Sequence, residues 1–503
     1  MATTEESQQA RTTDHDVRPN GRQVAPGSPG TRSGDNAITR FFELEKYNVT
    51  VGSEIMAGLT TFLVMAYIAF VNPGILTTLP DSAGFRLDFG ATVTATCWVA
   101  SVLCILMGIY AKRPFAMAPG MGLNAVVMFQ LVAGAGLTWA QAFGIIFLEG
   151  VIITALVLTN FRQAIMDAVP MNLKRAIAAG IGLFILYIGL NNGGIVAGNP
   201  VYATDPTVPP VGLGNFATPT ILVTLFGLLL TVFLEVRKQK GAILIGILGA
   251  TIFAVILNYL YIATGAGAIF REGTAVIPSG VVATPTLPYF FLPDLTPFTT
   301  APITSSLNTF SIMLSDFFDT MGTLVGVGLL AGFLNEKGQL PGVQKPLLVD
   351  SVGPIAGGLF GASSATTYIE SGAGVSEGGR TGLVAVTVGI LFLLVPFFTP
   401  IIAIVPAQAT APALILVGFF MLRTLKDVDW ADLKEALPVL ITMIAMPLTY
   451  SITNGIGFGF ILFTAMMIFT GAVRKIHWLM WVATAAFVLY FMSGLIRSWV
   501  GVA

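Results

Sequence analysis

The sequence predicts an all-α polytopic membrane protein with fourteen transmembrane segments in two inverted seven-helix repeats. Of the 503 residues, 55% are hydrophobic and 10% charged, and the mean hydropathy is +0.82, whereas soluble domains have roughly one quarter charged residues. Apolar runs of about 18 residues or more also recur along the chain, and each can cross a hydrocarbon core of roughly 30 Å as a helix. Finally, two short, interrupted apolar segments occupy matching positions in the two halves.

Apolar windows define the expected segments in chain order. They predict helices at 53–72, 88–110, 120–133, 138–158, 175–190, 217–235, 240–262, 303–332, 344–361, 369–377, 380–402, 406–423, 436–451 and 453–471. A further apolar stretch at 477–497 is expected either to lie in the membrane interface or to form a fifteenth span.

The third and tenth segments are too short to cross a membrane. They follow FAMAPGMGLNA (115–125) and SSATTYIESGA (363–373), which are stretches of small residues, the first with a proline. We therefore expect two half-helices, each entered from a short extended strand.

The polar segments set the orientation. Lys and Arg cluster in six loops, whereas residues 191–216 contain neither. Under the positive-inside rule, the N-terminus and the basic loops are expected on the cytoplasmic side of the cell membrane. Residues 1–40 are polar and lack an apolar h-region, which predicts a disordered tail and no signal peptide. Cys97 and Cys104 fall in one apolar segment at a spacing that prevents a disulfide, so both are expected to be inert.

Two pairs of residues indicate the repeat. Phe62 in the first segment precedes Asn124 in the third by 62 residues, and Phe310 in the eighth precedes Glu370 in the tenth by 60. Seven segments thus occur twice, and an odd number per half requires the second copy to be inverted. Paired broken helices are the best sequence indication of a transporter's binding site, so we expect Glu370 near mid-membrane where they cross.

Acidic residues inside apolar segments are the strongest functional candidates. A carboxylate at mid-membrane costs roughly 2.5–3.5 kcal/mol on insertion scales and usually marks a substrate or ion pathway. Asp316 and Asp319 occupy positions i and i+3 of the eighth segment, on one helix face, and Glu370 begins the tenth. Burial opposes ionisation, which makes these groups candidates to exchange protons. The alternative is a helix cap or a hydrogen bond between helices.

An amide and several glycines extend the candidate site. Asn124 holds the place in the first repeat that Glu370 holds in the second, and its amide can both donate to and accept from a heterocycle. Half-helices starting at mid-membrane would also direct unpaired N–H groups between the repeats, which suits a polar planar solute or an anion. Glycines there allow close backbone approach or simply close helix packing: Gly120, Gly122, Gly372 and Gly374.

Other charged residues are expected to be structural. Glu149 and Asp350 lie within apolar runs, but nothing in the sequence puts them beside the broken helices. Glu377 and Arg380 fall at a turn near the cytoplasmic face and are expected to pair with each other.

No enzyme, metal site or cofactor is indicated. His15 lies in the tail and His477 at a helix end, so neither a Ser/His set nor a His-rich metal site is expected in the membrane. The glycine-rich segments do not match a P-loop, which argues against ATP as the energy source. An intramembrane enzyme with Ser364 or Ser371 as nucleophile stays an alternative, as does a passive channel or a receptor.

Three ordered motifs resemble the AzgA-type purine permeases, a branch related to the nucleobase/ascorbate transporters. They are APGMGLNA (118–125), SDFFDTMGTLVG (315–326) and SSATTYIESGAGVSEGGRTG (363–382), and MPLTYSITNGIGFGF (446–460) looks similar as well. The resemblance covers nearly everything from about residue 40 onwards. It implies a uracil-transporter-like 7+7 fold and proton-coupled uptake of adenine, guanine, hypoxanthine or related purines by alternating access.

The resemblance also implies roles for individual residues. A proton is expected on Asp316 or Glu370, with sodium as the less favoured ion, and coupled acids titrate as a set. The substrate-binding residues that it implies are Glu370, Asp316, Asn124 and Asp319. Ser371 and Gly372, which directly follow Glu370, are further candidates for substrate binding.

Two domains follow from the same resemblance. A core domain would comprise 41–158 and 303–403 (helices 1–4 and 8–11), and a gate domain 159–302 and 404–503 (helices 5–7, helices 12–14 and the final apolar segment). The expected partners are a purine, a proton and the lipid bilayer; a homodimer is a further expectation, and nucleic acid is not. The closest alternative keeps the architecture but carries an anion such as sulfate or bicarbonate. The acidic residues disfavour it, because an anion site should prefer a cation.

Overall fold

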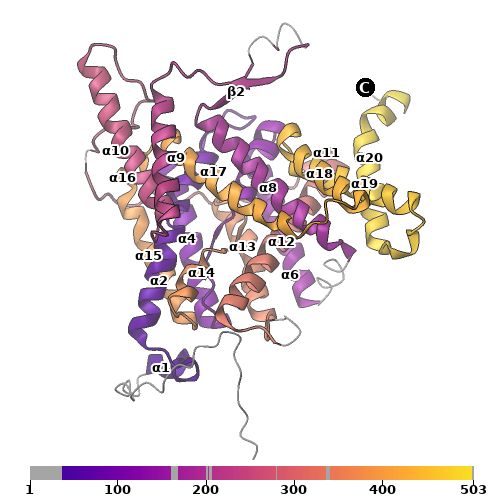
Figure 1. Cartoon of the computed structure of the whole chain (residues 1–503), viewed down its shortest axis with the longest axis horizontal. Coiled ribbons are helices and arrows are strands. Elements are labelled where there is room, and N and C mark those ends of the chain that lie inside the picture. Colours follow the sequence, from indigo (N-terminus) through magenta and orange to yellow (C-terminus); the bar gives the residue numbers. More distant parts are fainter. Residues whose placement is uncertain are drawn as a thin grey trace, which may run out of the picture.

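The computed structural model is predominantly helical, with two short pairs of strands (Figure 1). It describes residues 37–159, 168–199, 202, 207–278, 280–335 and 340–500. Of the predicted tail, 1–40, residues 1–36 lie outside the described residues. The described chain begins with α1 (Ala37–Phe41) and the 3-10 turn η1 (Leu44–Tyr47).

The first half of the chain forms most of the predicted segments. Its helices are α2 (Val51–Met65), α3 (Ile68–Leu76), α4 (Phe89–Leu106) with the π-helical turn η2 (Met107–Ala111), α5 (Met121–Ala125) with the π-helical η3 (Val126–Gly134), α6 (Trp139–Leu158), α8 (Met171–Asn192), α9 (Thr220–Val236) and α10 (Ala242–Ala263). Its strands are β1 (Met117–Pro119), before α5, and the hairpin of β2 (Val196–Gly198) and β3 (Val211–Leu213).

The second half continues the pattern. Its helices are α11 (Pro297–Thr300), α12 (Pro302–Ala331), α13 (Gln344–Phe360), α14 (Ser371–Ser376), α15 (Gly382–Leu394), η5 (Val395–Phe398), α16 (Thr399–Ala403), α17 (Ala407–Leu422), η6 (Arg423–Asp427), α18 (Leu433–Thr449), α19 (Ile452–Phe469), η7 (Val473–Lys475) and α20 (Trp478–Val500). The strand β4 (Ala365–Thr367) precedes α14.

Local chemistry explains several helix boundaries. The Thr50 side chain caps α2 by accepting from the Ser53 backbone N–H, and Thr138 caps α6 by accepting from Gln141 in the same way. Both are capping boxes, which satisfy two of the backbone N–H groups left unpaired at a helix start. The predicted first segment is in fact two helices, because the chain breaks between α2 and α3 at Tyr67.

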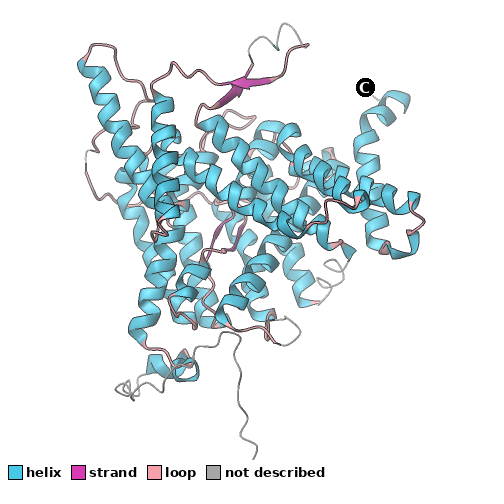
Figure 2. Ribbon diagram, viewed as in Figure 1, coloured by secondary structure: helices cyan, strands magenta, loops and turns pink. Residues whose placement is uncertain are grey.

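Strands β1 and β4 join the two halves of the chain at the centre of the molecule (Figure 2). They pair antiparallel, with Met117 opposite Thr367 and Pro119 opposite Ala365. Each strand leads into a short helix, α5 or α14, as predicted for the third and tenth segments. The pairing satisfies backbone groups that would otherwise be unpaired at membrane depth.

The helices pack in two groups. The first helix group consists of α2–α6 and α12–α15 with the strands β1 and β4, and the second consists of α8–α10 and α17–α19. Within the second group, α17 lies along α8 (Figure 1). The groups meet where α8 contacts α5 and α12, and where α17 contacts α3.

The chain is a multi-pass membrane protein. Among the described residues, nine helices are long and apolar enough to cross a membrane, and three shorter apolar helices accompany them. The ambiguous stretch at 477–497 forms α20, which packs against α19 and α12. Cys97 and Cys104 are both buried and free, as predicted.

Candidate functional site

A small cavity lies where the paired strands meet α12 on one side and α8 and α17 on the other. Its volume is about 90 Å³. The first helix group supplies all of the carboxyl, hydroxyl and phenol groups that line it, whereas the second supplies only apolar side chains. The site therefore lies at the boundary between the two groups.

Glu370 lines this cavity and immediately precedes α14. The Tyr67 hydroxyl donates to Glu370 Oε1 at 2.6 Å. Tyr67 lies at the break between α2 and α3 and is only 1% exposed. Hydrogen bonds to an ionised carboxylate are roughly twice as strong as neutral ones. Tyr67 therefore orients the carboxyl group that faces the cavity.

Helix α12 presents a polar stripe to the same space. Ser315, Asp319 and Thr323 all line the cavity. They follow one another at intervals of four residues, which places them on one helix face. Two carboxyl groups, Asp319 and Glu370, thus face one narrow space from different elements.

The opposite wall is apolar. Ile181 and Ile185 of α8 and Val417 and Met421 of α17 close the cavity on the side of the second helix group. The half-helix α5 lies directly against α8, since a side chain at Gly122 would collide with Ile181. A flat ring between these walls would bury its faces while its polar edge met the carboxyl groups.

Hydrogen bonds brace the strands beside the cavity. The Tyr368 hydroxyl donates to the Pro119 carbonyl at 2.5 Å, across from β4 to β1. The Ser371 hydroxyl donates to the Tyr368 carbonyl at 2.6 Å and accepts from the Ala116 N–H at 2.9 Å. Ser371 is therefore engaged with backbone and does not line the cavity.

Asp350 of α13 fixes β4 from behind. Its Oδ1 accepts from the Thr367 N–H at 2.9 Å and from the Thr367 hydroxyl at 2.8 Å, and its Oδ2 accepts from the Thr320 hydroxyl at 2.6 Å. Because Thr367 itself lines the cavity, Asp350 is one residue removed from the site. Asp350 thus lies beside a broken helix, where nothing in the sequence placed it, and its bonds to β4 are compatible with the structural role expected for it.

Three other predicted residues do not line the cavity. Asp316 is fully buried within electrostatic reach of Glu149 on α6. Three residues turn a helix by about 300°, so side chains at i and i+3 diverge by about 60°, and only Asp319 reaches the cavity. Asn124 is fully buried in α5. A side chain at Gly372 would contact Leu330 of α12.

The predicted pairing of Glu377 with Arg380 is wrong. Glu377 forms an ion pair of 2.7 Å with Lys240, from the turn before α10. The Arg380 guanidinium donates instead to the carbonyls of Val375 and Gly379. The Lys240–Glu377 pair thus links the second helix group to the end of α14.

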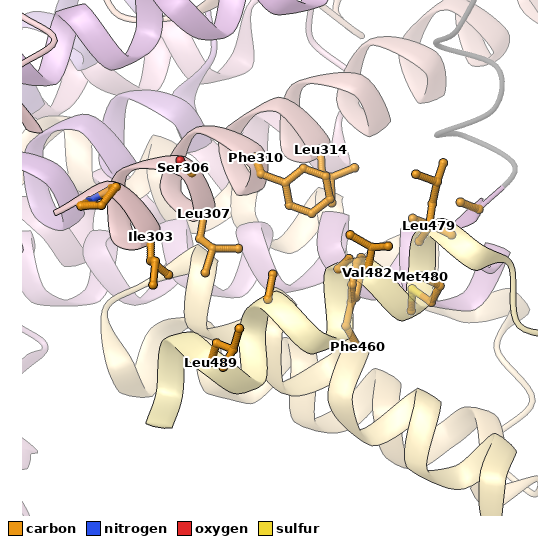
Figure 3. Close-up of a pocket in the computed structure, with 15 residues that line it drawn as sticks. Ile303, Ser306, Leu307, Phe310, Leu314, Phe460, Leu479, Met480, Val482 and Leu489 are labelled. Carbon is orange, nitrogen blue, oxygen red and sulfur yellow. The ribbon is translucent and has the colours of Figure 1, made fainter. Parts of the chain in front are cut away.

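A larger cavity of about 520 Å³ lies between α12, α19 and α20. Figure 3 shows Leu307, Phe310 and Leu314 of α12 facing Val482 and Leu489 of α20 across it. Its lining is almost wholly apolar, so no polar groups converge there to orient a solute. Among the described residues, no group of three His, Cys, Asp or Glu side chains is arranged to hold a metal.

Sequence reasoning missed several residues of the cavity. Tyr67 reads as one more aromatic in an apolar run, and its only signal is that a buried tyrosine hydroxyl needs a partner. Ser315 and Thr323 lie within the motif at 315–326, but nothing in the sequence distinguishes them from the other residues of that motif. The apolar wall comes from α8 and α17, whose approach to the broken helices is a tertiary contact.

Comparisons with known proteins agree on a family. Residues 52–458 match the sequence model of a family described as the Permease family. The chain is 39% identical to the guanine/hypoxanthine permease of Bacillus subtilis, covering 90% of this chain and 99% of that protein. It is 38% identical to an adenine permease of Escherichia coli, covering 90% and 95%. The transmembrane domain of a cyanobacterium bicarbonate transporter has the same fold, with a TM-score of 0.56 at 16% identity, covering 80% and 97%.

Proposed function

Since this chain belongs to the nucleobase/ascorbate transporter family of permeases, we propose that it carries purine nucleobases into the cell together with protons. One observation carries the proposal. Two carboxyl groups, Asp319 and Glu370, face a narrow cavity whose opposite wall is apolar. Purines have ring N–H donors at their edge and flat apolar faces, and this cavity offers a partner for each.

The binding mode follows from the donors and acceptors present. Ring N–H groups would donate to Glu370 and Asp319, and the hydroxyls of Ser315 and Thr323 can donate to ring nitrogens or exocyclic oxygens. Ile181 and Met421 would cover one face of the ring. Asp316 and Asn124 do not line the cavity, so in this binding mode they would influence the purine only through the residues that contact it.

The two helix groups support a mechanism of alternating access. We assign the first group to a core domain (41–158 and 303–403) and the second to a gate domain (159–302 and 404–503), in fourteen spans with the N-terminus in the cytoplasm of a cell-membrane protein. The paired strands make the carboxyl side of the cavity one unit, so the core can move against the gate with the purine bound to it. Asp316 and Glu370 are the candidates from sequence for carrying the proton that biases this motion.

An anion carrier is the second candidate, because the bicarbonate transporter shares the fold. The carboxyl groups of Asp319 and Glu370 disfavour it. They would repel an anion in a low-dielectric space, and no Lys or Arg lines the cavity among the described residues.

Uptake of radiolabelled adenine and hypoxanthine tests the proposal. We expect the wild-type protein to accumulate at least one of them, and a protonophore to abolish the accumulation. Glu370→Gln should lose uptake while it still reaches the membrane. Glu377→Gln is the matched control, because Glu377 ends the same short helix but its side chain is 40% exposed and pairs with Lys240. Wild-type uptake by Glu370→Gln, or uptake that a protonophore leaves intact, would count against the proposal.

A further inference from the structure

A second set of carboxyl groups does not line the cavity. It consists of Glu149 on α6, Asp316 on α12 and Asp350 on α13, and the charges of Asp316 and Asp350 both act on Glu149. Helix α6 lies flush on α13, because a side chain at Gly150 would collide with Ile355 at a distance of 2.6 Å. One turn further, the Thr154 hydroxyl donates to Ser351, the neighbour of Asp350.

Glu149 lacks the hydrogen-bond donors that Glu54 and Asp350, two other buried acids, possess. It is 0% exposed, and neither of its carboxyl oxygens has a hydrogen-bond partner among the described residues. Glu54 is equally buried, yet it accepts from the Arg380 N–H at 2.8 Å and from the N–H and hydroxyl of Thr381 at 3.0 and 2.6 Å. A buried carboxyl group without donors points to a missing ligand.

The charges around Glu149 identify that ligand. Helix α6 packs against α12, α13 and η3. The titratable groups that face Glu149 from α12 and α13 are the acids Asp316 and Asp350, and η3 contains none. Asp319 turns to the cavity, and Lys345, at the start of α13, lies over the Tyr110 ring. An ionised Glu149 would meet two like charges in a low dielectric without a donor, whereas a proton removes all of this repulsion.

We propose that Glu149 is a proton-binding site of the transport cycle, which the expectation of a structural role overlooked. This inference rests on the proposed function of proton-coupled purine transport. The proton binds one carboxyl oxygen of Glu149 and leaves from it as H⁺, with no other bond made or broken. Asp350 connects the site to the purine cavity, since it accepts hydrogen bonds from Thr367, which lines that cavity.

Purified protein in proteoliposomes tests the inference through two readouts. Purine exchange at equal pH on both sides reports binding and domain movement, and purine accumulation driven by a pH gradient reports coupling. Glu149→Gln mimics the protonated side chain permanently. We expect it to exchange purine like the wild type but to lose accumulation. Glu54→Gln is the matched control at an equally buried acid with donors, and should be less heat-stable but still accumulate purine.

Each outcome decides a separate claim. Absence of exchange by the wild type would overturn the proposed function and this inference with it. If Glu149→Gln exchanges purine and its accumulation driven by a pH gradient is undiminished, the inference alone is overturned. It is also overturned if a sodium gradient drives accumulation by the wild type and Glu149→Gln loses that accumulation. If Glu149→Gln does not fold, Glu149→Asp serves instead, because its shorter side chain keeps a carboxyl group but moves it. This variant should shift the pH of half-maximal uptake, and an unchanged pH profile would overturn the inference.

Discussion

Replacement of Asp350 separates the charge of this residue from its hydrogen bonds. In Asp350→Asn, the side-chain oxygen can still accept from the N–H and hydroxyl of Thr367, and the new NH₂ group can donate to the Thr320 hydroxyl. The variant loses the charge but leaves no hydrogen-bond donor without an acceptor, so we expect its free energy of unfolding to fall by about 1 kcal/mol. In Asp350→Ala, the two hydroxyls can turn to other acceptors, such as Thr366 for Thr320 at 2.8 Å.

The Thr367 N–H has no such freedom, because the backbone fixes it. Its lost bond to a carboxylate costs about 1.5–3 kcal/mol, and the removed side chain leaves a cavity that adds to this. We therefore expect the free energy of unfolding to fall by about 2 kcal/mol more in Asp350→Ala than in Asp350→Asn. If β4 must be reordered when purine binds, that difference corresponds to about thirty-fold weaker binding.

Thermal unfolding of the purified variants and titration with radiolabelled adenine or hypoxanthine measure the two effects. Asp350→Asn should bind purine nearly as well as the wild type, and Asp350→Ala should bind it much more weakly at a lower melting temperature. Equal stability and equal affinity of the two variants would refute the idea that Asp350 holds β4 through these bonds.

Three further predictions address other contacts. Tyr67→Phe removes the 2.6 Å bond to Glu370, worth about 1.5–3 kcal/mol for an ionised carboxylate, so the purine Kd should rise about tenfold or more; an unchanged Kd would exclude an orienting role. Gln130→Leu strands the Ile452 N–H, which now donates to Gln130 Oε1 at 2.9 Å, and should cost about 1–3 kcal/mol in thermal stability, whereas an unchanged melting temperature would contradict this. Hydrogen bonds from the Thr296 hydroxyl and N–H hold the pKa of Asp294, in the loop before α11, below its ordinary value. The stability that this carboxylate contributes is fully present above its pKa in the unfolded chain and is lost as the pH falls through its pKa in the folded protein. Asp294→Asn should thus lower the melting temperature at neutral pH, and the difference from the wild type should vanish in acid; a constant difference would be the contrary result.

Much of the fold is local enough to be predicted from the sequence. Apolar windows locate the long helices, and the small-residue stretches before Asn124 and Glu370 predict the strands β1 and β4. The pairing of these strands does not follow from either stretch alone. It follows from the inverted repeat, which brings two similar segments to the same depth from opposite sides.

The site was less accessible to sequence reasoning, because tertiary contacts select which acids reach the cavity. Asp350 reaches β4 because α13 lies flush on β4 and on the residues that lead into it, where a side chain at Gly353 or Gly357 would collide with the carbonyls of Ala365 or Ser363. Likewise, Glu377 pairs with Lys240, which is remote in sequence, and not with its near neighbour Arg380. No periodicity encodes such choices.

The antiparallel pairing of β1 with β4 has a consequence for synthesis of the protein. The ribosome completes β1 long before it begins β4, and until then the carbonyls and amides of Met117–Pro119 lack the partners they have in the finished molecule. An incomplete chain in the bilayer must shelter that segment in water, in the translocon or against another helix. Nascent chains that stop before Ala365 should therefore be recognised and degraded, whereas slightly longer ones that include α14 should begin to resist proteolysis.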